Sequence, residues 1–183
     1  MDNLDIPQVA EKRETRISKW LTMVERDIIF PGETEKETYH SVRPYDYVSI
    51  LAITRDRRIP LVKQYRPILE RETLELPGGL VDDDGMSPET TVLAELHQET
   101  GMKAPSAKAI GVLAPDPGRL DNKFYCFFAD NVEVDPDAVI EKRIEVVWTN
   151  WNELRNMVSD GRFTSSPQIA LLALAYFRGC IND

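Results

Sequence analysis

Two glutamates four residues apart, Glu95 and Glu99, are the residues of this sequence best placed to do chemistry. On a helix, side chains at this spacing project from one face about one turn apart. Two like charges so placed weaken a helix unless a cation lies between them, and Mg²⁺ takes carboxylate oxygens while sharing them with substrate phosphates. The pair therefore indicates either a divalent metal site or a solvated acidic face, and the spacing alone favours the solvated face.

A helix that could carry the pair is well marked at both ends. Ser87 is a favourable N-cap, and Pro88 suits the first helical position. Gly101 stands where a helix needs a left-handed residue just past its end. The stretch from Gly78 to Met102 is thus predicted to run from a glycine turn through an acidic loop into one helix.

Length, composition and charge limit the number of domains and the kinds of partner that the chain can have. The 183 residues suit one domain with a small extension, and 42% hydrophobic with 29% charged residues is ordinary for a globular protein. A net charge of −9 argues against a nucleic-acid polymer as partner, because phosphate backbones bind basic surfaces. It leaves room for a small phosphorylated ligand held through a metal.

The expected location is the cytoplasm, with no membrane partner. No apolar run approaches the ~20 residues that span a bilayer, and the polar start of the chain is unlike a signal peptide. Cys126 and Cys180 are too few for a disulfide framework, so we expect two reduced, apolar core fillers.

The order of predicted elements is strands, helix, strands, helices. Residues 1–13 show no period and are expected to form a flexible or loosely docked arm. Residues 45–54 and 58–65 are predicted to form a hairpin around the turn 55–57. The remaining predicted strands cover 20–30, 72–76, 107–113, 123–129 and 143–149, and two further helices cover 150–159 and 165–178. This order fits an α+β or α/β sandwich in which helices cover a mixed sheet.

The central stretch resembles the Nudix box. That motif places a glycine, a spaced glutamate and then Arg-Glu-apolar-any-Glu-Glu-any-Gly-apolar. The matching positions in this chain are Gly79, Glu95-Leu96, Glu99 and Gly101-Met102. Glu75-Leu76-Pro77-Gly78-Gly79 resembles the entry to the box in ADP-ribose and nucleoside-diphosphate-sugar pyrophosphatases. The same subgroup has segments similar to residues 63–66, 144–148 and 170–172, and a marker proline at about the position of Pro117.

The resemblance implies a fold, a division of the chain and an assembly. The fold is an α/β/α sandwich with a mixed sheet. A Nudix domain would occupy residues 44–183, and residues 1–43 would form an N-terminal arm with strands. In the subgroup such strands often help to build a homodimer, and the segment from Trp20 to Phe30 is expected to do so here.

The resemblance also implies a reaction, which is hydrolysis of a nucleoside diphosphate linked to another group, giving two monophosphates. ADP-ribose is the first substrate to test. Glu95 and Glu99 would ligate Mg²⁺ or Mn²⁺, with the Gly78 carbonyl as a backbone ligand. Glu141 is the candidate catalytic base, ahead of Glu145 and Asp137. Substrate binding is assigned to Arg66, Arg119 and the loop proline Pro117.

Three departures from the box fall on functional positions. Met86 takes the place of the first glutamate, which requires one extra residue in the loop Asp82-Asp83-Asp84. Ala94 replaces the arginine and Gln98 replaces the first glutamate of the closing pair. If the family's first box glutamate, replaced here by Met86, forms an ion pair with the arginine that Ala94 replaces, the loss of both residues leaves no unpaired charge. Less negative charge predicts fewer metal ions or weaker binding.

Two classes of function therefore stay open. The first is a metal-dependent Nudix pyrophosphohydrolase, supported by Glu95, Glu99 and Pro117. The second is a Nudix-fold protein with weakened catalysis that binds a nucleotide as a sensor or regulator, supported by the three substitutions.

Overall fold

The computed structural model describes residues 6–81 and 85–181, and the chain forms two compact units. The first unit contains Met1–Tyr45 and Ala114–Lys123. The second contains Asp46–Leu113 and Phe124–Asp183. The triplet Asp82-Asp83-Asp84 and the extra residue expected there lie outside the described residues.

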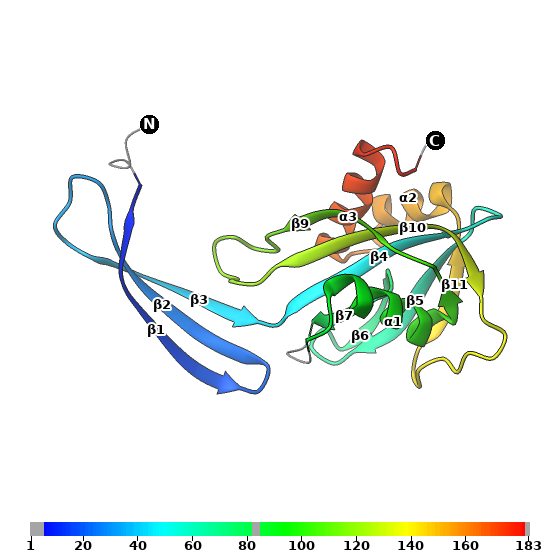
Figure 1. Cartoon of the computed structure of the whole chain (residues 1–183), viewed down its shortest axis with the longest axis horizontal. Helices are drawn as coiled ribbons and strands as arrows, with labels where there is room; N and C mark the ends of the chain where they lie inside the picture. The colour runs from blue at the N-terminus through cyan, green and yellow to red at the C-terminus, as the bar shows by residue number, and fades with distance from the viewer. Residues whose placement is uncertain (1–5, 82–84, 182–183) are drawn as a thin grey trace. The chain divides into compact units, whose positions relative to one another are not determined.

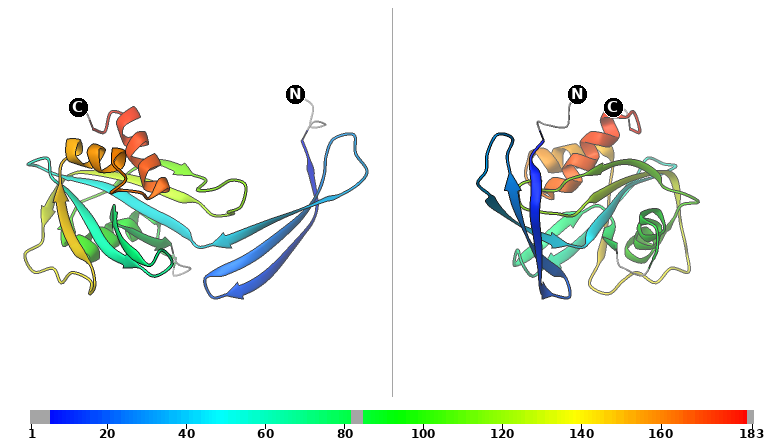
Figure 2. Two further views of the ribbon diagram at one scale, coloured as in Figure 1. Left: turned by 180° about the vertical axis from the view of Figure 1, so that it is seen from behind. Right: turned by 60° about the vertical axis from the view of Figure 1, so that its left-hand side comes forward.

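The first unit is a three-stranded antiparallel sheet. Its strands, in spatial order, are β1 (Gln8–Ser18), β2 (Leu21–Ile29) and β3 (Glu37–Pro44). Figure 2 shows the long, twisted hairpin of β1 and β2 in blue. The expectation of a flexible arm over residues 1–13 is wrong from Gln8 onward, because cross-strand ion pairs order this polar strand. Arg13 donates to both carboxylate oxygens of Asp27, at 3.1 and 3.0 Å.

The proline-rich segment Ala114–Lys123 is attached to this sheet through β3. The Val42 amide donates to the Arg119 carbonyl at 2.9 Å, and the Asp121 amide donates to the Val42 carbonyl at 2.9 Å. The Asp121 carboxylate also pairs with Arg26 of β2 at 2.6 Å. Backbone and side-chain contacts together therefore fix this loop on the sheet.

The second unit has a five-stranded mixed sheet, a three-stranded antiparallel sheet and helices on both faces, which confirms the predicted α+β sandwich (Figure 1). Strand β4 runs parallel to β10 and antiparallel to β7, while β8 and β9 pair with β10, and β5 lies between β11 and β6. The element bounds are β4 (Asp46–Thr54), β5 (Ile59–Arg66), β6 (Arg71–Glu75), β7 (Gly78–Val81), α1 (Pro88–Thr100), β8 (Met102–Lys103), β9 (Lys108–Leu113), β10 (Phe124–Val134), β11 (Glu145–Thr149), α2 (Trp151–Ser159) and α3 (Ser166–Phe177).

Alternate residues of β4 build the two cores. Val48, Ile50 and Ala52 belong to the core that contains Val92 and Leu96 of α1. Leu51 and Ile53 belong to the other core, together with residues of α2 and α3. In Figure 1, α1 accordingly lies below the sheet, and α2 and α3 lie above it. The period-2 alternation of a strand buried on both faces produces this three-layer arrangement.

The helix boundaries follow their capping residues. The Ser87 hydroxyl accepts a hydrogen bond from the Thr90 amide, and Gly101 ends α1 in the left-handed region at φ 69°. The Asn150 side chain caps α2 by accepting from the Glu153 amide. These three sequence predictions are confirmed.

Two local predictions are wrong. Strands β4 and β5 are joined by a tight turn, but they pair with different neighbours and form no hairpin ladder. Gly78 and Gly79 lie in strand β7 rather than in a turn. Gly78 is required by close approach, because a Cβ there would lie 2.2 Å from the Val48 carbonyl oxygen.

Both cysteines are free. Cys126 is fully buried in β10, and burial raises the pKa of its thiol to about 12. Cys180 is half-buried. Among the described residues, no helix combines the length and the apolar character needed to cross a bilayer.

Candidate functional site

Helix α1 and strand β7 bring the predicted metal ligands together. The Glu99 side chain is buried, with the residue 5% exposed, and Glu95 is half-buried. The Gly78 amide donates to Glu99 Oε2 at 2.9 Å. A Cβ at Gly79 would lie 2.1 Å from Glu95 Oε1, so the Glu95 carboxylate occupies the space that a side chain at Gly79 would fill. A solvated acidic face does not describe Glu99.

Glu99 has the electrostatics of a carboxyl crowded by like charge. Its pKa is raised to about 8, chiefly by burial and in smaller part by the negative charges of Glu95 and Glu141, while the Gly78 amide and Arg66 act in the opposite direction. Strongly perturbed carboxyls of this kind concentrate at functional sites. A bound cation would stabilise the ionised form that burial disfavours.

Of the three candidate bases, Glu141 is the one whose backbone contacts α1. Its amide donates to the Gln98 carbonyl at 2.9 Å, and its charge acts on Glu99. Glu145, on β11, pairs with Lys63 of β5 at 3.2 Å. Asp137 is exposed, and its amide donates to Asp135 Oδ1 at 3.3 Å.

Arg66 forms a two-point ion pair rather than standing alone at the end of its strand. Its Nε and Nη2 atoms lie 2.7 and 2.6 Å from the two carboxylate oxygens of Glu75, and the Thr73 hydroxyl donates to the same carboxylate. The Arg66 guanidinium and the Thr73 hydroxyl hold the pKa of Glu75 below its usual value, against the opposing effect of burial. Arg66 and Glu75 border a cavity of about 450 Å³, which Thr164 and Ser165 also line.

Sequence reasoning missed the roles of Glu75 and Tyr47. Burial raises the pKa of Tyr47, and the charges of Glu75, Glu99 and Glu95 raise it further, so its phenol lies in the same acidic neighbourhood. Its ring stacks on Phe124 at 5.6 Å. The available signal for Glu75 was a lone carboxylate between Leu74 and Leu76, since a buried charge needs a partner.

The other predicted substrate residues belong to the first unit. Arg119 is 81% exposed, and its Nε lies 2.7 Å from Asp116 Oδ2. Pro117 lies in the same loop. The second unit contains the remaining predicted site residues, which are Gly78, Arg66, Glu95, Glu99 and Glu141.

The three departures from the box have different surroundings. Met86 is 43% exposed, directly before the N-cap of α1. Ala94 is half-buried on the helix, and Gln98 is exposed one residue before Glu99. Because Gln98 faces solvent, its amide could be exchanged for a carboxylate without rebuilding the core.

The carboxylates of Glu95 and Glu99 fit a hard divalent cation whose remaining coordination positions are filled by water and substrate. Within residues 6–81 and 85–181, no three His, Cys, Asp or Glu side chains are grouped closely enough to hold a metal ion. Mg²⁺ is commonly held by one or two carboxylates, with waters and substrate phosphates as its other ligands. Glu95 and Glu99 match that requirement, and the crowded, buried carboxyl of Glu99 is the observation that calls for positive charge.

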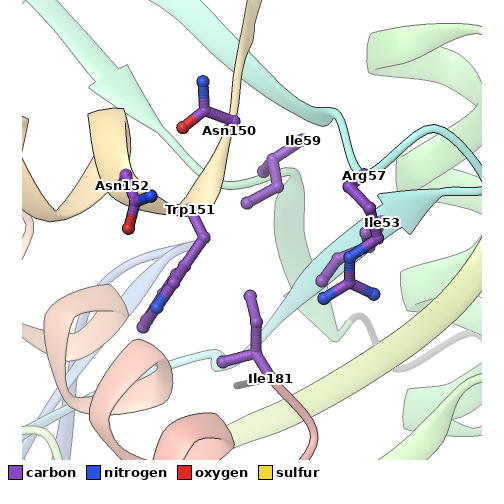
Figure 3. Close-up of a pocket in the computed structure, with 7 residues that line it drawn as sticks. All are labelled: Ile53, Arg57, Ile59, Asn150, Trp151, Asn152 and Ile181. Carbon is purple, nitrogen blue, oxygen red and sulfur yellow. The ribbon is translucent and has the colours of Figure 1, made fainter. Parts of the chain in front are cut away.

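Figure 3 shows a second cavity, of about 390 Å³, whose lining includes none of these acids. Its lining includes Ile53, Ile59 and Ile181, which belong to the core on the α2 and α3 side of the sheet. The Asn150 side chain beside it caps α2. This cavity is therefore separate from the chemistry at Glu95 and Glu99.

The glycine of β7 that faces Glu95 gives a direct test of the site. Gly79→Ala should lower kcat by about 100-fold, because displacing a catalytic group by about 1 Å can cost that much. Its urea midpoint should fall less than that of Gly78→Ala, whose Cβ would meet the Val48 backbone instead of a movable side chain. Steady-state kinetics and urea unfolding of both variants measure this, and an unchanged kcat in Gly79→Ala would contradict the placement of Glu95.

Comparison with known proteins shows the family to which the chain belongs. The model of the NUDIX domain matches residues 44–171. An ADP-ribose pyrophosphatase of Bacillus subtilis (strain 168) is 36% identical over 149 residues, which cover 77% of this chain and 78% of that protein. A CMP-5′-(N-acetyl-N-hydroxy-3-aminopropyl)phosphonate hydrolase of Streptomyces rubellomurinus is 29% identical over 166 residues, covering 89% and 79% of the two chains.

A solved structure shares the fold. The crystal structure of an ADP compounds hydrolase superposes with a TM-score of 0.80 at 20% identity, covering 98% of each chain. The family resemblance drawn from the Nudix box is confirmed by the domain match and by the Bacillus relative. The chain therefore belongs to the Nudix family of pyrophosphohydrolases, and within that family it resembles the ADP-ribose pyrophosphatases.

Proposed function

We propose that the chain hydrolyses a nucleoside diphosphate linked to a sugar, with ADP-ribose as the leading substrate and Mg²⁺ or Mn²⁺ as the cofactor. The observation that carries the proposal is the buried Glu99 carboxyl beside the charges of Glu95 and Glu141, inside a Nudix domain. The relatives named above act on an ADP-sugar and on a CMP-linked phosphonate, which supports a nucleotide substrate.

Glu95 and Glu99 would hold the cation, with the Gly78 carbonyl as a further ligand. When bound, the cation supplies neutralisation of the diphosphate oxygens and a more acidic water. Glu141 accepts a proton from the water that attacks phosphorus, and the P–O bond to the leaving phosphate breaks with its electron pair. Arg66, whose orientation is fixed by Glu75, would contact a phosphate oxygen, and the Nudix resemblance assigns Arg119 and Pro117 of the first unit to substrate binding.

The proposed assembly is a homodimer formed through the first unit. Its three-stranded sheet exposes several apolar side chains, whose exposed fractions are 57% for Val9, 57% for Ile17, 50% for Trp20 and 49% for Tyr39. An exposed apolar surface on a small sheet is typical of an interaction site. The proposed ligands are small nucleotides rather than nucleic-acid polymers or membranes, and the proposed location is the cytoplasm.

The second candidate function is nucleotide binding with little turnover. It is favoured by Met86, Ala94 and Gln98, which together remove charges that the family motif carries. The test is a panel of nucleoside diphosphate sugars with Mg²⁺ or Mn²⁺, in which both hydrolysis and binding are measured. Hydrolysis of one member to two monophosphates supports the enzyme, whereas tight binding of a member without any turnover supports the sensor.

Restoring the missing carboxylate tests the consequence of Gln98. Gln98→Glu should lower the Mg²⁺ concentration for half-maximal activity by about fivefold, since one added charge near a cation contributes on the order of 1 kcal/mol in a solvated setting. Gln98→Met, which keeps the shape without a charge, is the matched control and should bind Mg²⁺ like the wild type. Equal Mg²⁺ dependence in all three proteins would refute the expectation of weaker metal binding.

A further inference from the structure

The loop between β10 and β11 is hydrogen-bonded to the C-terminal end of α1. The Asp135 amide donates to the Gly101 carbonyl at 2.8 Å, and the Glu141 amide donates to the Gln98 carbonyl at 2.9 Å. Carbonyls at a helix end lack partners within the helix. The helix that carries Glu99 therefore obtains part of its C-terminal hydrogen bonding from this loop.

One carboxylate joins three elements at this junction. Asp135 Oδ2 lies 2.8 Å from His97 Nε2 of α1 and 2.6 Å from Lys103 Nζ of β8. Asp135 Oδ1 accepts the Asp137 amide at 3.3 Å, at the start of the loop. The Asp135 side chain is 13% exposed, whereas the Lys103 side chain is 62% exposed. Asp135 is thus the centre of the cluster.

Apolar packing holds the rest of the loop only in part, because Ala138 and Ile140 lie near Gly101 while Val139 faces solvent. Val139 is 89% exposed and Ile140 is 39% exposed. Glu141 follows directly, is itself exposed, and acts electrostatically on the buried Glu99. The position of the Glu141 carboxylate therefore depends in large part on the polar anchors at Asp135 and at the Glu141 amide.

We propose that Asp135 is a positioning residue, which, through His97 and Lys103, holds the 135–144 loop so that the Glu141 carboxylate lies beside Glu99. This role rests on the proposed function, in which Glu141 accepts the proton of the attacking water. It gives His97 a task that is not metal binding, since its imidazole turns to Asp135 although it lies between two predicted ligands in sequence.

The effect should fall on kcat rather than on binding. Asp135→Asn keeps the size of the side chain but removes its charge, and kcat should fall about 10- to 100-fold, as when an orienting partner is lost. KM for ADP-ribose and the Mn²⁺ affinity should stay within about twofold, because Asp135 is not one of the residues proposed to bind the metal or the substrate. His97→Ala should reproduce a smaller part of the same loss.

A double-mutant cycle separates positioning from general damage. If Asp135 acts through Glu141, then Glu141→Gln and the double variant Asp135→Asn/Glu141→Gln should have the same kcat. Amide hydrogen exchange should be faster at Glu141 in Asp135→Asn and unchanged at Leu96 in the helix core. Glu133→Gln, which removes an exposed charge from the end of β10, is the control and should match the wild type.

Each outcome bears on a different claim. Full activity in Asp135→Asn, or a further loss of kcat in the double variant, overturns the positioning role while leaving the hydrolase intact. An active wild type with a fully active Glu141→Gln overturns both the base and its positioning. A wild type that hydrolyses no nucleotide sugar overturns the proposed function together with this inference. If Asp135→Asn does not fold, His97→Ala carries the same comparison.

Discussion

Glu99→Gln should lower kcat for ADP-ribose hydrolysis by at least about 100-fold, because it removes the buried carboxylate proposed to hold the metal. The variant should still fold, since glutamine has the shape of glutamate and its amide oxygen can accept the Gly78 amide hydrogen bond. Initial rates over a range of Mg²⁺ and ADP-ribose concentrations, with circular dichroism as the check on folding, measure this effect.

The matched control lies on the same helix. Glu89→Gln removes a carboxylate from the first turn of α1, where Glu89 accepts a hydrogen bond from the Ala107 amide at 3.2 Å, and its kcat should be that of the wild type. Equal losses in both variants would show that helix charge in general, rather than Glu99, sets the rate. An unchanged rate in Glu99→Gln would remove the basis for the metal assignment.

The same substitution should stabilise the metal-free protein at high pH. Folding raises the Glu99 pKa from 4.5 to about 8, so the folded state binds more protons than the unfolded state between these values. The stability that Glu99 contributes is therefore complete below about pH 4.5 and is lost as the pH rises to about 8. At about 1.4 kcal/mol for each pKa unit, the loss reaches a few kcal/mol.

Glu99→Gln has no carboxyl to ionise, so its free energy of unfolding should exceed that of the wild type by a gap that widens from pH 5 to pH 8.5. Urea unfolding in a chelator across this range measures the gap. Excess Mn²⁺ should narrow it at pH 8.5, because a cation that binds the folded state stabilises the wild type. A gap that stays constant or shrinks with rising pH would show that Glu99 is not buried as an uncompensated carboxyl.

Local signals in the sequence were enough for helix α1 and for the layered core. A side-chain cap at Ser87 and a left-handed glycine at Gly101 each act within one helical turn, so they can be recognised without knowing the fold. The apolar run of β4 likewise predicts a strand, which the structure covers on both faces. These features define the helix that carries Glu95 and Glu99.

Features set by distant partners could not be predicted in this way. Strand β1 is mostly polar and is ordered by pairs such as Arg13 with Asp27, which the sequence separates by fourteen positions. The tight turn after β4 favours a hairpin, but β4 pairs with β10 and β7 instead. Pairing across a sheet depends on the neighbours that the whole chain supplies.

The candidate site likewise has features that the sequence predicts and features that depend on distant partners. The spacing of Glu95 and Glu99 can be read along one helix, and the Nudix resemblance adds the glycines of β7. The burial of Glu99 against Gly78, the contact of Glu141 with the end of α1 and the pairing of Arg66 with Glu75 all depend on tertiary structure. Those contacts decide which of several acids share one electrostatic environment.

The central claim is that Glu95 and Glu99 hold a divalent cation at a substrate diphosphate. The most direct measurement is a crystal structure of Glu141→Gln, slowed in turnover, with Mg²⁺ and ADP-ribose. We expect density for an ion about 2.1 Å from oxygens of Glu95, Glu99 and the diphosphate. A diphosphate bound elsewhere, or an ion held without either glutamate, would contradict it.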